Sequence, residues 1–332
     1  MIITTHSYPR AALIGNPSDG YYGKTIAFPF SNFKAEVVLY ETPELEIIPA
    51  DYDTHVFTSL EGLVKDVKLY GYYGGIRLIK AAIMRFYEYC NENSINLDDR
   101  NFTIRYHSTI PFRLGLAGSS AIITACMKAL MSFYSIDVPK PLLANLVLSV
   151  EVEELKITAG LQDRVVQAYE CPVYMDFSKD FMDKNGYGDY QPLSKDLFPS
   201  LYIAYRLELS EGSEVVHNNF KARYNFGDEK VLQAVEDWKE LSEKAKSVLE
   251  SSNHSDLGDL MDRNFDIRKS VMNITQDNIK MVEMARSVGA SAKFTGSGGA
   301  IIGTYANEKM FDDLCNIMKT ENIEVIKPKI IG

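Results

Sequence analysis

Cysteine is scarce in this sequence, and long hydrophobic runs and an excess of positive charge are missing altogether. The 332 residues include four cysteines (Cys90, Cys126, Cys171 and Cys315), whose spacing matches neither a metal site nor a disulfide framework. We therefore expect reduced thiols and a cytoplasmic protein. No stretch approaches roughly 18 uninterrupted apolar residues, so we expect no transmembrane helix. Residues 1–15 lack the cationic segment and apolar core of a signal peptide.

The chain carries more acidic than basic side chains. Lysine and arginine number 35 against 45 aspartates and glutamates, which gives a net charge of −10. This balance excludes a basic footprint for nucleic acid, although backbone N–H groups or a few arginines suffice to bind a small anion. The hydrophobic share of 46% and the aromatic share of 11% exclude a disordered chain. The length favours two domains.

Hydrophobic periodicity predicts helices and strands in both halves of the chain. Strands are expected at 35–40, 45–50, 102–110, 201–209, 300–306 and 323–331, and helices at 76–90, 122–130, 231–241 and 279–288. The first two strands flank a Thr-Pro turn, which predicts a β-hairpin. Because strands and helices do not alternate strictly, the pattern indicates an α+β fold. Apolar periodicity fades at 178–200, the expected domain boundary or long connection.

The first candidate functional segment covers residues 111–121, where a strand ends, a turn follows and a helix begins. Gly115 and Gly118 permit a close backbone approach, and Ser119 and Ser120 open the helix. Exposed N–H groups and the positive end of the helix dipole suit a polyphosphate, and a serine hydroxyl there suits Mg²⁺. The alternative interpretation is an ordinary glycine turn with a serine cap.

Two better-known phosphate motifs do not fit this sequence. The run Gly23-Lys24-Thr25 looks like the end of a Walker A loop, but Ser18 occupies the position of the required first glycine. The run 296–299 looks like a dinucleotide fingerprint, but Ile301 replaces its third glycine. The chain is therefore expected to be neither a P-loop protein nor a Rossmann protein.

A second segment combines the acids of 151–154 with the run Gly160-Leu-Gln-Asp163-Arg164. An aspartate beside a cation stays ionised and can accept or orient a hydroxyl proton. Glu151 is a candidate carboxylate for Mg²⁺. The alternative is a surface helix with solvated acids and a capping aspartate.

A third segment, Lys293-Phe-Thr-Gly-Ser-Gly-Gly-Ala300, lies between an expected helix and an expected strand. Three glycines in four residues indicate a backbone that crosses close to another chain segment or to a ligand. The alternative is a tight connection between helix and strand.

Taken in order, the chain resembles the GHMP kinases, the family of galactokinase, homoserine kinase, mevalonate kinase and phosphomevalonate kinase. Their three signatures are similar to residues 9–19, 111–121 and 293–300. The resemblance implies a two-domain α+β fold. An N-terminal domain over 1–185, like domain 2 of ribosomal protein S5, would bind the nucleotide, and a ferredoxin-like domain over 186–332 would carry the glycine loop. It also implies ATP and Mg²⁺.

Within that family, four strings resemble the glucuronokinase branch of plants. They lie at 13–20, 71–75, 159–164 and 264–268. This resemblance implies ATP-dependent phosphorylation of the anomeric (C1) hydroxyl of D-glucuronate to glucuronate 1-phosphate. The expected partners are a small sugar acid and ATP, without nucleic acid or membrane, for a monomer or homodimer.

The family resemblance also implies roles for individual residues. Asp163 falls on the aspartate beside the reacting hydroxyl, and Arg10 on the arginine that neutralises charge on the transferring phosphoryl group. The nucleotide is expected at Pro111, Gly115, Leu116, Ala117, Gly118, Ser119 and Ser120. The sugar is expected at Asn16, Asp19, Lys24, Arg164, Arg268, Gly296, Ser297 and Gly298, of which Lys24, Arg164 and Arg268 are candidate cations for the carboxylate. The metal is expected at Ser120 and Glu151, with Glu153 and Glu154 as alternatives to Glu151.

Two departures from the family pattern bear on the substrate. Asn16 stands where galactokinase-like proteins have glutamate, and Ala117 replaces the usual glycine of the phosphate loop. Removing a carboxylate from a sugar pocket favours a substrate that is itself an anion. The alternatives are another sugar 1-kinase of the family, for galacturonate, galactose or heptose, and a non-catalytic sensor of sugar and nucleotide.

Overall fold

The computed structural model describes residues 1–50, 74–206, 214–251 and 253–332, which form two compact units assembled from interleaved stretches of the chain. Unit 1 comprises Met1–Pro9, Phe33–Phe112 and Ala117–Ala168, and unit 2 comprises Arg10–Asn32, Arg113–Leu116 and Tyr169–Gly332. These divisions differ from the sequential domains 1–185 and 186–332, which stay a prediction. No described helix combines the length and the apolar character needed to cross a bilayer.

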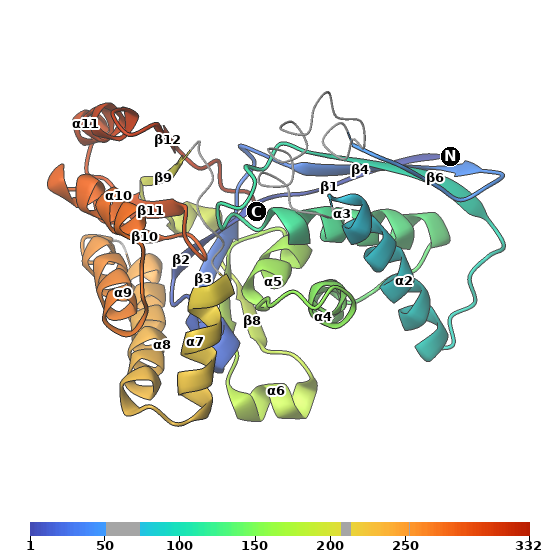
Figure 1. Ribbon diagram of the computed structural model, residues 1–332, viewed down its shortest axis with the longest axis horizontal. Helices are drawn as coiled ribbons and strands as arrows, with labels where there is room; N and C mark the ends of the chain where they lie inside the picture. Colours follow the sequence, from blue (N-terminus) through green and yellow to red (C-terminus); the bar gives the residue numbers. More distant parts are fainter. Residues whose placement is uncertain (51–73, 207–213, 252) are drawn as a thin grey trace, which may run out of the picture. The chain divides into compact units, whose positions relative to one another are not determined.

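Unit 1 consists of a four-stranded sheet with helices packed on it. The strands, in the order β1-β4-β6-β5, are β1 (Ile2–Ser7), β4 (Ala35–Thr42), β6 (Asn101–Ser108) and β5 (Glu46–Ile48). The helices are α2 (Ile76–Glu92), α3 (Gly118–Tyr134), α4 (Lys140–Ser149) and α5 (Gln162–Tyr169). Helix α3 packs on β1 and β4, and α2 packs on α3 (Figure 1).

The register of this sheet places alternate side chains of β4 against α3. Ala35, Val37 and Leu39 are buried, while the residues between them are partly exposed. This period of two is the pattern of a half-buried strand. The strand expected at 102–110 is confirmed as β6, and the helix expected at 76–90 is confirmed as α2.

The predicted β-hairpin of 35–40 and 45–50 is wrong in its pairing. Both strands form, but β4 pairs antiparallel with β1 and β6, so both of its edges are occupied. Strand β5 instead joins the free edge of β6 in a parallel ladder from Glu46↔Thr103 to Ile48↔Arg105. The local turn signal was correct, whereas the partner came from a distant part of the chain.

Unit 2 contains two further four-stranded sheets. The first has the order β2-β3-β7-β8, with β2 (Arg10–Ile14), β3 (Lys24–Pro29), β7 (Val173–Asp176) and β8 (Asp189–Pro192). The second has the order β10-β11-β9-β12, with β10 (Lys293–Phe294), β11 (Ala300–Thr304), β9 (Leu201–Arg206) and β12 (Ile323–Ile326). The described stretch at 178–200, expected to be a connection, contains β8, whose pairing with β7 makes it part of a sheet.

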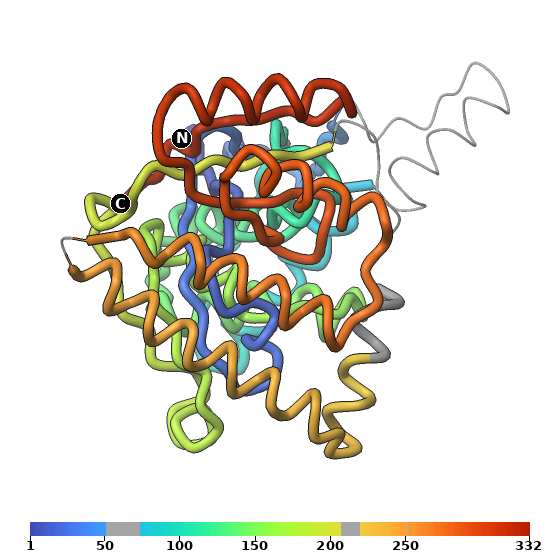
Figure 2. The backbone as a smooth tube through the Cα atoms, turned by 90° about the vertical axis from the view of Figure 1, so that its left-hand side faces the viewer, coloured from blue at the N-terminus to red at the C-terminus, as the bar shows by residue number. Residues whose placement is uncertain are grey.

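The helices of unit 2 pack around these two sheets. They are α6 (Lys179–Asn185), α7 (Glu214–Asn225), α8 (Glu229–Glu250), α9 (Leu257–Val271), α10 (Gln276–Ser287) and α11 (Glu308–Lys319). Helices α8 and α9, in two shades of orange in Figure 2, run side by side. Helix α8 begins at the capping residue Asp228, whose Oδ1 accepts hydrogen bonds from the N–H groups of Lys230 (3.0 Å) and Val231 (3.4 Å).

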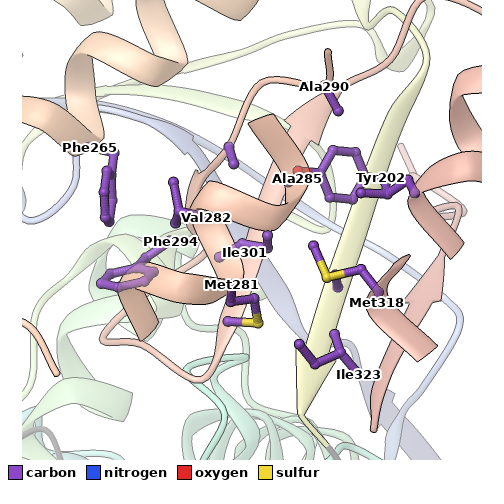
Figure 3. Close-up of a cluster of buried hydrophobic side chains, with 13 residues drawn as sticks. Tyr202, Phe265, Met281, Val282, Ala285, Ala290, Phe294, Ile301, Met318 and Ile323 are labelled. Carbon is purple, nitrogen blue, oxygen red and sulfur yellow. The ribbon is translucent and has the colours of Figure 1, made fainter. Parts of the chain in front are cut away.

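An apolar core joins α9, α10 and the second sheet of unit 2. Figure 3 shows Phe265 of α9 near Phe294 of β10, with Met281 and Val282 of α10 in the same cluster. The Phe265 and Phe294 rings meet edge to face at 5.3 Å, a geometry that adds to the free energy of apolar burial. This core fixes α9 against the first residues of the glycine loop.

Candidate active site

In unit 2, Arg10 lies at the meeting point of the glycine loop (residues 293–300) and the short segment 113–116. Its backbone N–H donates to Leu116 O at 3.1 Å. Its Nη1 donates to Gly115 O at 3.3 Å and also to Thr295 O. The guanidinium is almost wholly buried, so its charge acts in a medium of low polarity. The structure therefore brings Arg10, Gly115 and the glycine loop together.

The glycines of this region are required by close contact between backbones. Gly115 has φ +66°, in the left-handed region that favours glycine. A Cβ on Gly296 would collide with Gly115 O and would lie 2.9 Å from Arg10 Nη1. Of the two interpretations of the glycine-rich run, the approach of another chain segment is confirmed.

Asn16 lies on the segment that follows β2, with its amide turned toward the glycine loop. Its Nδ2 donates to Phe294 O at 3.3 Å and to Gly296 O at 3.4 Å. The side chain is buried, and its Oδ1 accepts no hydrogen bond from the described part of the chain. A buried acceptor without a donor costs free energy, and Asn16 Oδ1 is such an acceptor beside the glycine loop.

Three buried basic side chains surround the glycine loop. Besides Arg10 they are Arg268 on α9 and Lys293 on β10. Lys293 Nζ donates to Ala12 O at 2.7 Å and to Phe294 O at 2.8 Å. Burial lowers the pKa of Lys293 well below its ordinary value, and the charges of Arg268 and Arg10 lower it further. The fixed positive charge here is that of Arg10 and Arg268, whose guanidinium groups donate to Thr295 O and Gly296 O of the same loop.

Asp19 supplies negative charge to the same cluster. Burial lowers the pKa of Arg268 to about 10, while the carboxylate of Asp19 and the hydroxyl of Tyr21 oppose that shift. Burial raises the pKa of Tyr21 to about 12, and Asp19 adds to the increase. Asp19 is partly exposed, so its carboxylate remains accessible to a ligand.

Lys24 lies between two carboxylates, which argues against its predicted role in holding a sugar acid. Its Nζ is 2.6 Å from Glu243 Oε1 and 3.1 Å from Asp176 Oδ2. Although burial opposes the charge, the hydrogen bonds to Glu243 and Asp176 raise the pKa of Lys24. Lys24 lines a polar cavity of about 490 Å³ with Glu236, Glu240 and Tyr224, apart from the residues expected to hold the sugar.

In unit 1, four predicted residues form one continuous polar network. Ser119 Oγ donates to Glu151 Oε1 at 2.7 Å, and Arg164 Nη2 donates to Glu151 Oε2. Arg164 Nη1 lies 3.0 Å from Asp163 Oδ2 and 2.8 Å from Gly160 O. Arg164 therefore holds the expected metal ligand and the expected catalytic aspartate at once. An arginine already paired with two carboxylates is not available to a substrate carboxylate, which argues against that predicted role.

The same network separates Glu151 from the two acids that the sequence left as alternatives. Glu151 lies in a π-helical turn, Val150–Glu154, that continues α4, and its side chain is only 2% exposed. Glu153 and Glu154 point elsewhere and pair with Arg85 of α2 at 3.3 and 3.9 Å. Single π-helical turns are frequent at functional sites. Here the turn directs Glu151 alone toward the start of α3.

The two serines at the start of α3 face different ways, which argues against the expectation that Ser120 binds the metal. Ser120 is wholly buried, and its Oγ donates to Ala117 O at 3.1 Å. Ser119 is exposed and contacts Glu151. Adjacent residues point about 100° apart around a helix, which is why only one of the pair faces the carboxylate. The oxygens of Ser119 and Glu151 therefore fit Mg²⁺ better than those of Ser120.

No group of three or more His, Cys, Asp or Glu side chains able to cage a metal occurs in the described ranges. Mg²⁺ commonly uses one or two carboxylates and completes its shell with substrate phosphates and water. One carboxylate and one hydroxyl are consistent with that mode of binding.

Ala117 adopts the backbone conformation that the missing glycine would favour. Its φ and ψ are +62° and +42°, in the left-handed region that strains a residue with a Cβ. Gln167 Nε2 donates to Ala117 O at 3.0 Å, so α5 holds this carbonyl in place. Pro111 and Gly118, also expected at the nucleotide, flank the same turn.

Sequence patterns had assigned no role to three residues of these networks: Asn264, Lys293 and Gln167. Asn264 and Arg268 lie four residues apart in the string 264–268, which is the spacing of one helix face, so Asn264 had a detectable signal. The string at 71–75 lies mostly outside the described residues.

Comparison with known proteins gives consistent matches. Residues 77–170 match the GHMP kinases N terminal domain. Glucuronokinase 1 of Arabidopsis thaliana is 42% identical over 90% of this chain and 84% of its own length. Probable glucuronokinase 2 of the same plant is 43% identical over 89% of this chain and 82% of its own length.

Solved structures show the same fold. Mevalonate kinase of Methanococcus jannaschii superposes with a TM-score of 0.73 at 19% identity, covering 100% of this chain and 98% of that one. Galactokinase of Lactococcus lactis, complexed with galactose, superposes with a TM-score of 0.74 at 13% identity, covering 100% and 94%. The expected α+β architecture of this fold is confirmed.

Proposed function

Because this chain belongs to the GHMP kinase family, we propose that it transfers the γ-phosphoryl group of ATP to the anomeric hydroxyl of D-glucuronate. The products are glucuronate 1-phosphate and ADP. The identity of 42% to a glucuronokinase over most of both chains supports this substrate. The observation that carries the proposal is the hydrogen-bonded network of Ser119, Glu151, Arg164 and Asp163, which joins the start of a phosphate-type helix to a carboxylate suited to a hydroxyl.

The reaction forms a bond between the C1 oxygen and the γ-phosphorus and breaks the bond from that phosphorus to the bridging β,γ-oxygen. Asp163 orients the C1 hydroxyl and takes its proton, and the guanidinium of Arg10 stabilises charge on the phosphoryl oxygens. Such reactions need positioning and charge stabilisation more than covalent help. The N–H groups of residues 115–120 bind the phosphates of ATP.

Ser119 and Glu151 are the residues that hold Mg²⁺ in this proposal. When bound, the ion supplies charge neutralisation for the β- and γ-phosphates. Ser120 instead supports the turn from within, through its hydrogen bond to Ala117 O. Arg164 keeps Glu151 and Asp163 in their places.

Selection of an acidic sugar rests on Asn16. A glutamate at this position would place a negative charge beside the glycine loop, where it would repel the substrate carboxylate. The neutral amide of Asn16 removes that repulsion. Asp19 and the glycine loop residues Gly296, Ser297 and Gly298 complete the proposed sugar contacts.

An ADP-release assay over glucuronate, galacturonate, glucose, galactose and a heptose tests the proposal. We expect kcat/KM for glucuronate to exceed that for glucose at least tenfold. A higher kcat/KM for galacturonate or a neutral sugar would assign a different substrate to the same kinase. Binding of sugar and ATP without any ADP release would identify a non-catalytic sensor and refute the proposal.

A further inference from the structure

Two polar side chains on one face of α9 are buried in unit 2. Asn264 is 1% exposed and Arg268 is 3% exposed. They stand four residues apart, so they project from the same side of the helix. Buried polar groups of this kind need hydrogen-bond partners, and theirs are backbone atoms of two separate chain segments.

Asn264 holds the segment 15–19 that follows β2. Its Oδ1 accepts a hydrogen bond from Gly15 N at 2.6 Å, and its Nδ2 donates to Asn16 O at 3.1 Å. Gly15 has φ +89°, and a Cβ there would collide with Lys24 O. The amide of Asn264 thus fixes a turn that only glycine can form, directly before Asn16.

Arg268 holds the glycine loop. Its Nη1 donates to Gly296 O at 2.8 Å, and its Nη2 donates to Ser297 O at 3.2 Å. The guanidinium also lies 5.0 Å from the centre of the Phe294 ring. Gly296 O is the same carbonyl that accepts from Asn16 Nδ2 at 3.4 Å. The two segments therefore share one hydrogen-bonded carbonyl.

Helix α9 itself is anchored, so it can serve as a fixed support. Trp238 Nε1 of α8 donates to the backbone Asn264 O at 3.2 Å. Phe265 packs against Phe294 in the apolar core. These contacts use the backbone carbonyl of Asn264 and the Phe265 ring, whereas the side-chain amide of Asn264 contacts Gly15 and Asn16.

The role of Arg268 as a direct clamp for the substrate carboxylate does not fit this geometry. The side chain is almost inaccessible, and it holds two carbonyls of the loop. A guanidinium in a rigid fork matches two adjacent backbone carbonyls as well as it matches a carboxylate.

We propose that Asn264 and Arg268 are positioning residues that set the relative placement of Asn16 and the glycine loop, and thereby the affinity for the sugar. The inference deepens the proposed function and rests on it. Neither residue contacts the sugar. Both act through the backbone of the residues that do, so a small displacement is enough to weaken binding.

The test uses Asn264→Ala and Arg268→Lys in the full chain, with Arg263→Ala as a control on the exposed side of the same helix. We expect KM for glucuronate to rise at least tenfold in the first two variants, while KM for ATP changes less than about threefold. The control should leave both constants unchanged. A role confined to stability would lower the melting temperature without this split between the two constants.

A second readout does not depend on turnover. Hydrogen exchange of residues 14–19 should accelerate at least tenfold in Asn264→Ala, since the Gly15 N–H loses its acceptor. Exchange in residues 296–299 should accelerate in Arg268→Lys, because a lysine ammonium cannot hold both carbonyls. The core of α9 should be unaffected. Should Asn264→Ala fail to fold, Arg268→Lys carries the comparison.

The outcomes separate the two proposals. If the wild type phosphorylates a different sugar, the proposed substrate is wrong, and the KM comparison is made with that sugar. If the wild type phosphorylates none, the exchange readout still decides whether α9 positions the loops. Unchanged exchange and unchanged sugar KM in both variants, or equal increases in the two KM values, would overturn the positioning role.

Discussion

Removing Arg164 should lower both the free energy of unfolding and kcat, and a second substitution at Glu151 should restore only the first. Arg164 is 4% exposed at its side chain and pairs with Glu151, which is 2% exposed, and with Asp163, which is 15% exposed. In Arg164→Met, the carboxylate of Glu151 stays buried, with the Ser119 hydroxyl still donating to it. Breaking a buried ion pair on one side costs about 3–5 kcal/mol, because the remaining charge is left uncompensated.

The double variant Arg164→Met/Glu151→Gln tests the cause of that loss. A neutral amide in place of the carboxylate removes the uncompensated charge, so the double variant should recover at least about 2 kcal/mol of the free energy of unfolding. Activity should not recover, because Glu151 is the proposed metal ligand and Asp163 has lost its support. We expect kcat at least about a hundredfold below wild type in both variants.

Urea denaturation and ADP release measure the two quantities separately. Lys244→Met serves as a control, because Lys244 pairs with Glu240 at 3.5 Å with side chains that are 63% and 65% exposed, and its removal should cost about 1 kcal/mol or less. Unfolding of Arg164→Met at the urea concentration of the wild type would contradict a buried, uncompensated charge on Glu151. A double variant no more stable than Arg164→Met would contradict it as well.

Three further changes have predictable results. Ala117→Gly should raise the free energy of unfolding by about 1 kcal/mol by relieving the left-handed backbone, whereas Ala129→Gly inside α3 should lower it by a similar amount; urea denaturation of both decides. Asn16→Asp should lower the ratio of kcat/KM for glucuronate to that for glucose by tenfold to about a hundredfold, since a charge about 6 Å from a carboxylate costs roughly 3 kcal/mol at an effective dielectric near 20; an unchanged ratio contradicts the charge argument. Burial raises the pKa of Cys126 from 9.0 to about 12. The unfolded state therefore loses this proton first, and the free energy of unfolding falls between pH 9 and 12 by at most about 4 kcal/mol. Cys126→Ala should flatten that fall, and an identical pH profile of stability in the variant would exclude this thiol as its cause.

Elements defined by short-range patterns could be predicted from the sequence. The periodicity of 76–90 depends only on neighbouring residues, and α2 forms there. The pairing of β5 could not be predicted, because it depends on β6, which begins more than fifty residues later and competes with the local turn. A strand pattern specifies a face, whereas the partner is chosen by the tertiary structure.

The candidate site shows the same division. Glycine spacing correctly predicted the close approach at Gly296, because only backbone without Cβ can lie there. The choice between Ser119 and Ser120 depends on which side of α3 faces Glu151. Because both residues are serines, the sequence does not show which of them that is. The role of Asn264 depends on Gly15, which is 249 residues away. The partners of Lys24 likewise come from distant strands and helices.

The position of the transferred phosphate tests the central claim most directly. Wild-type protein, ATP, Mg²⁺ and D-glucuronate should give a product whose phosphorus resonance couples to the anomeric H1, and Asp163→Asn should reduce its formation by orders of magnitude while keeping the wild-type fold. A phosphate on another carbon, ADP release without a sugar phosphate, or a fully active Asp163→Asn variant would contradict the account.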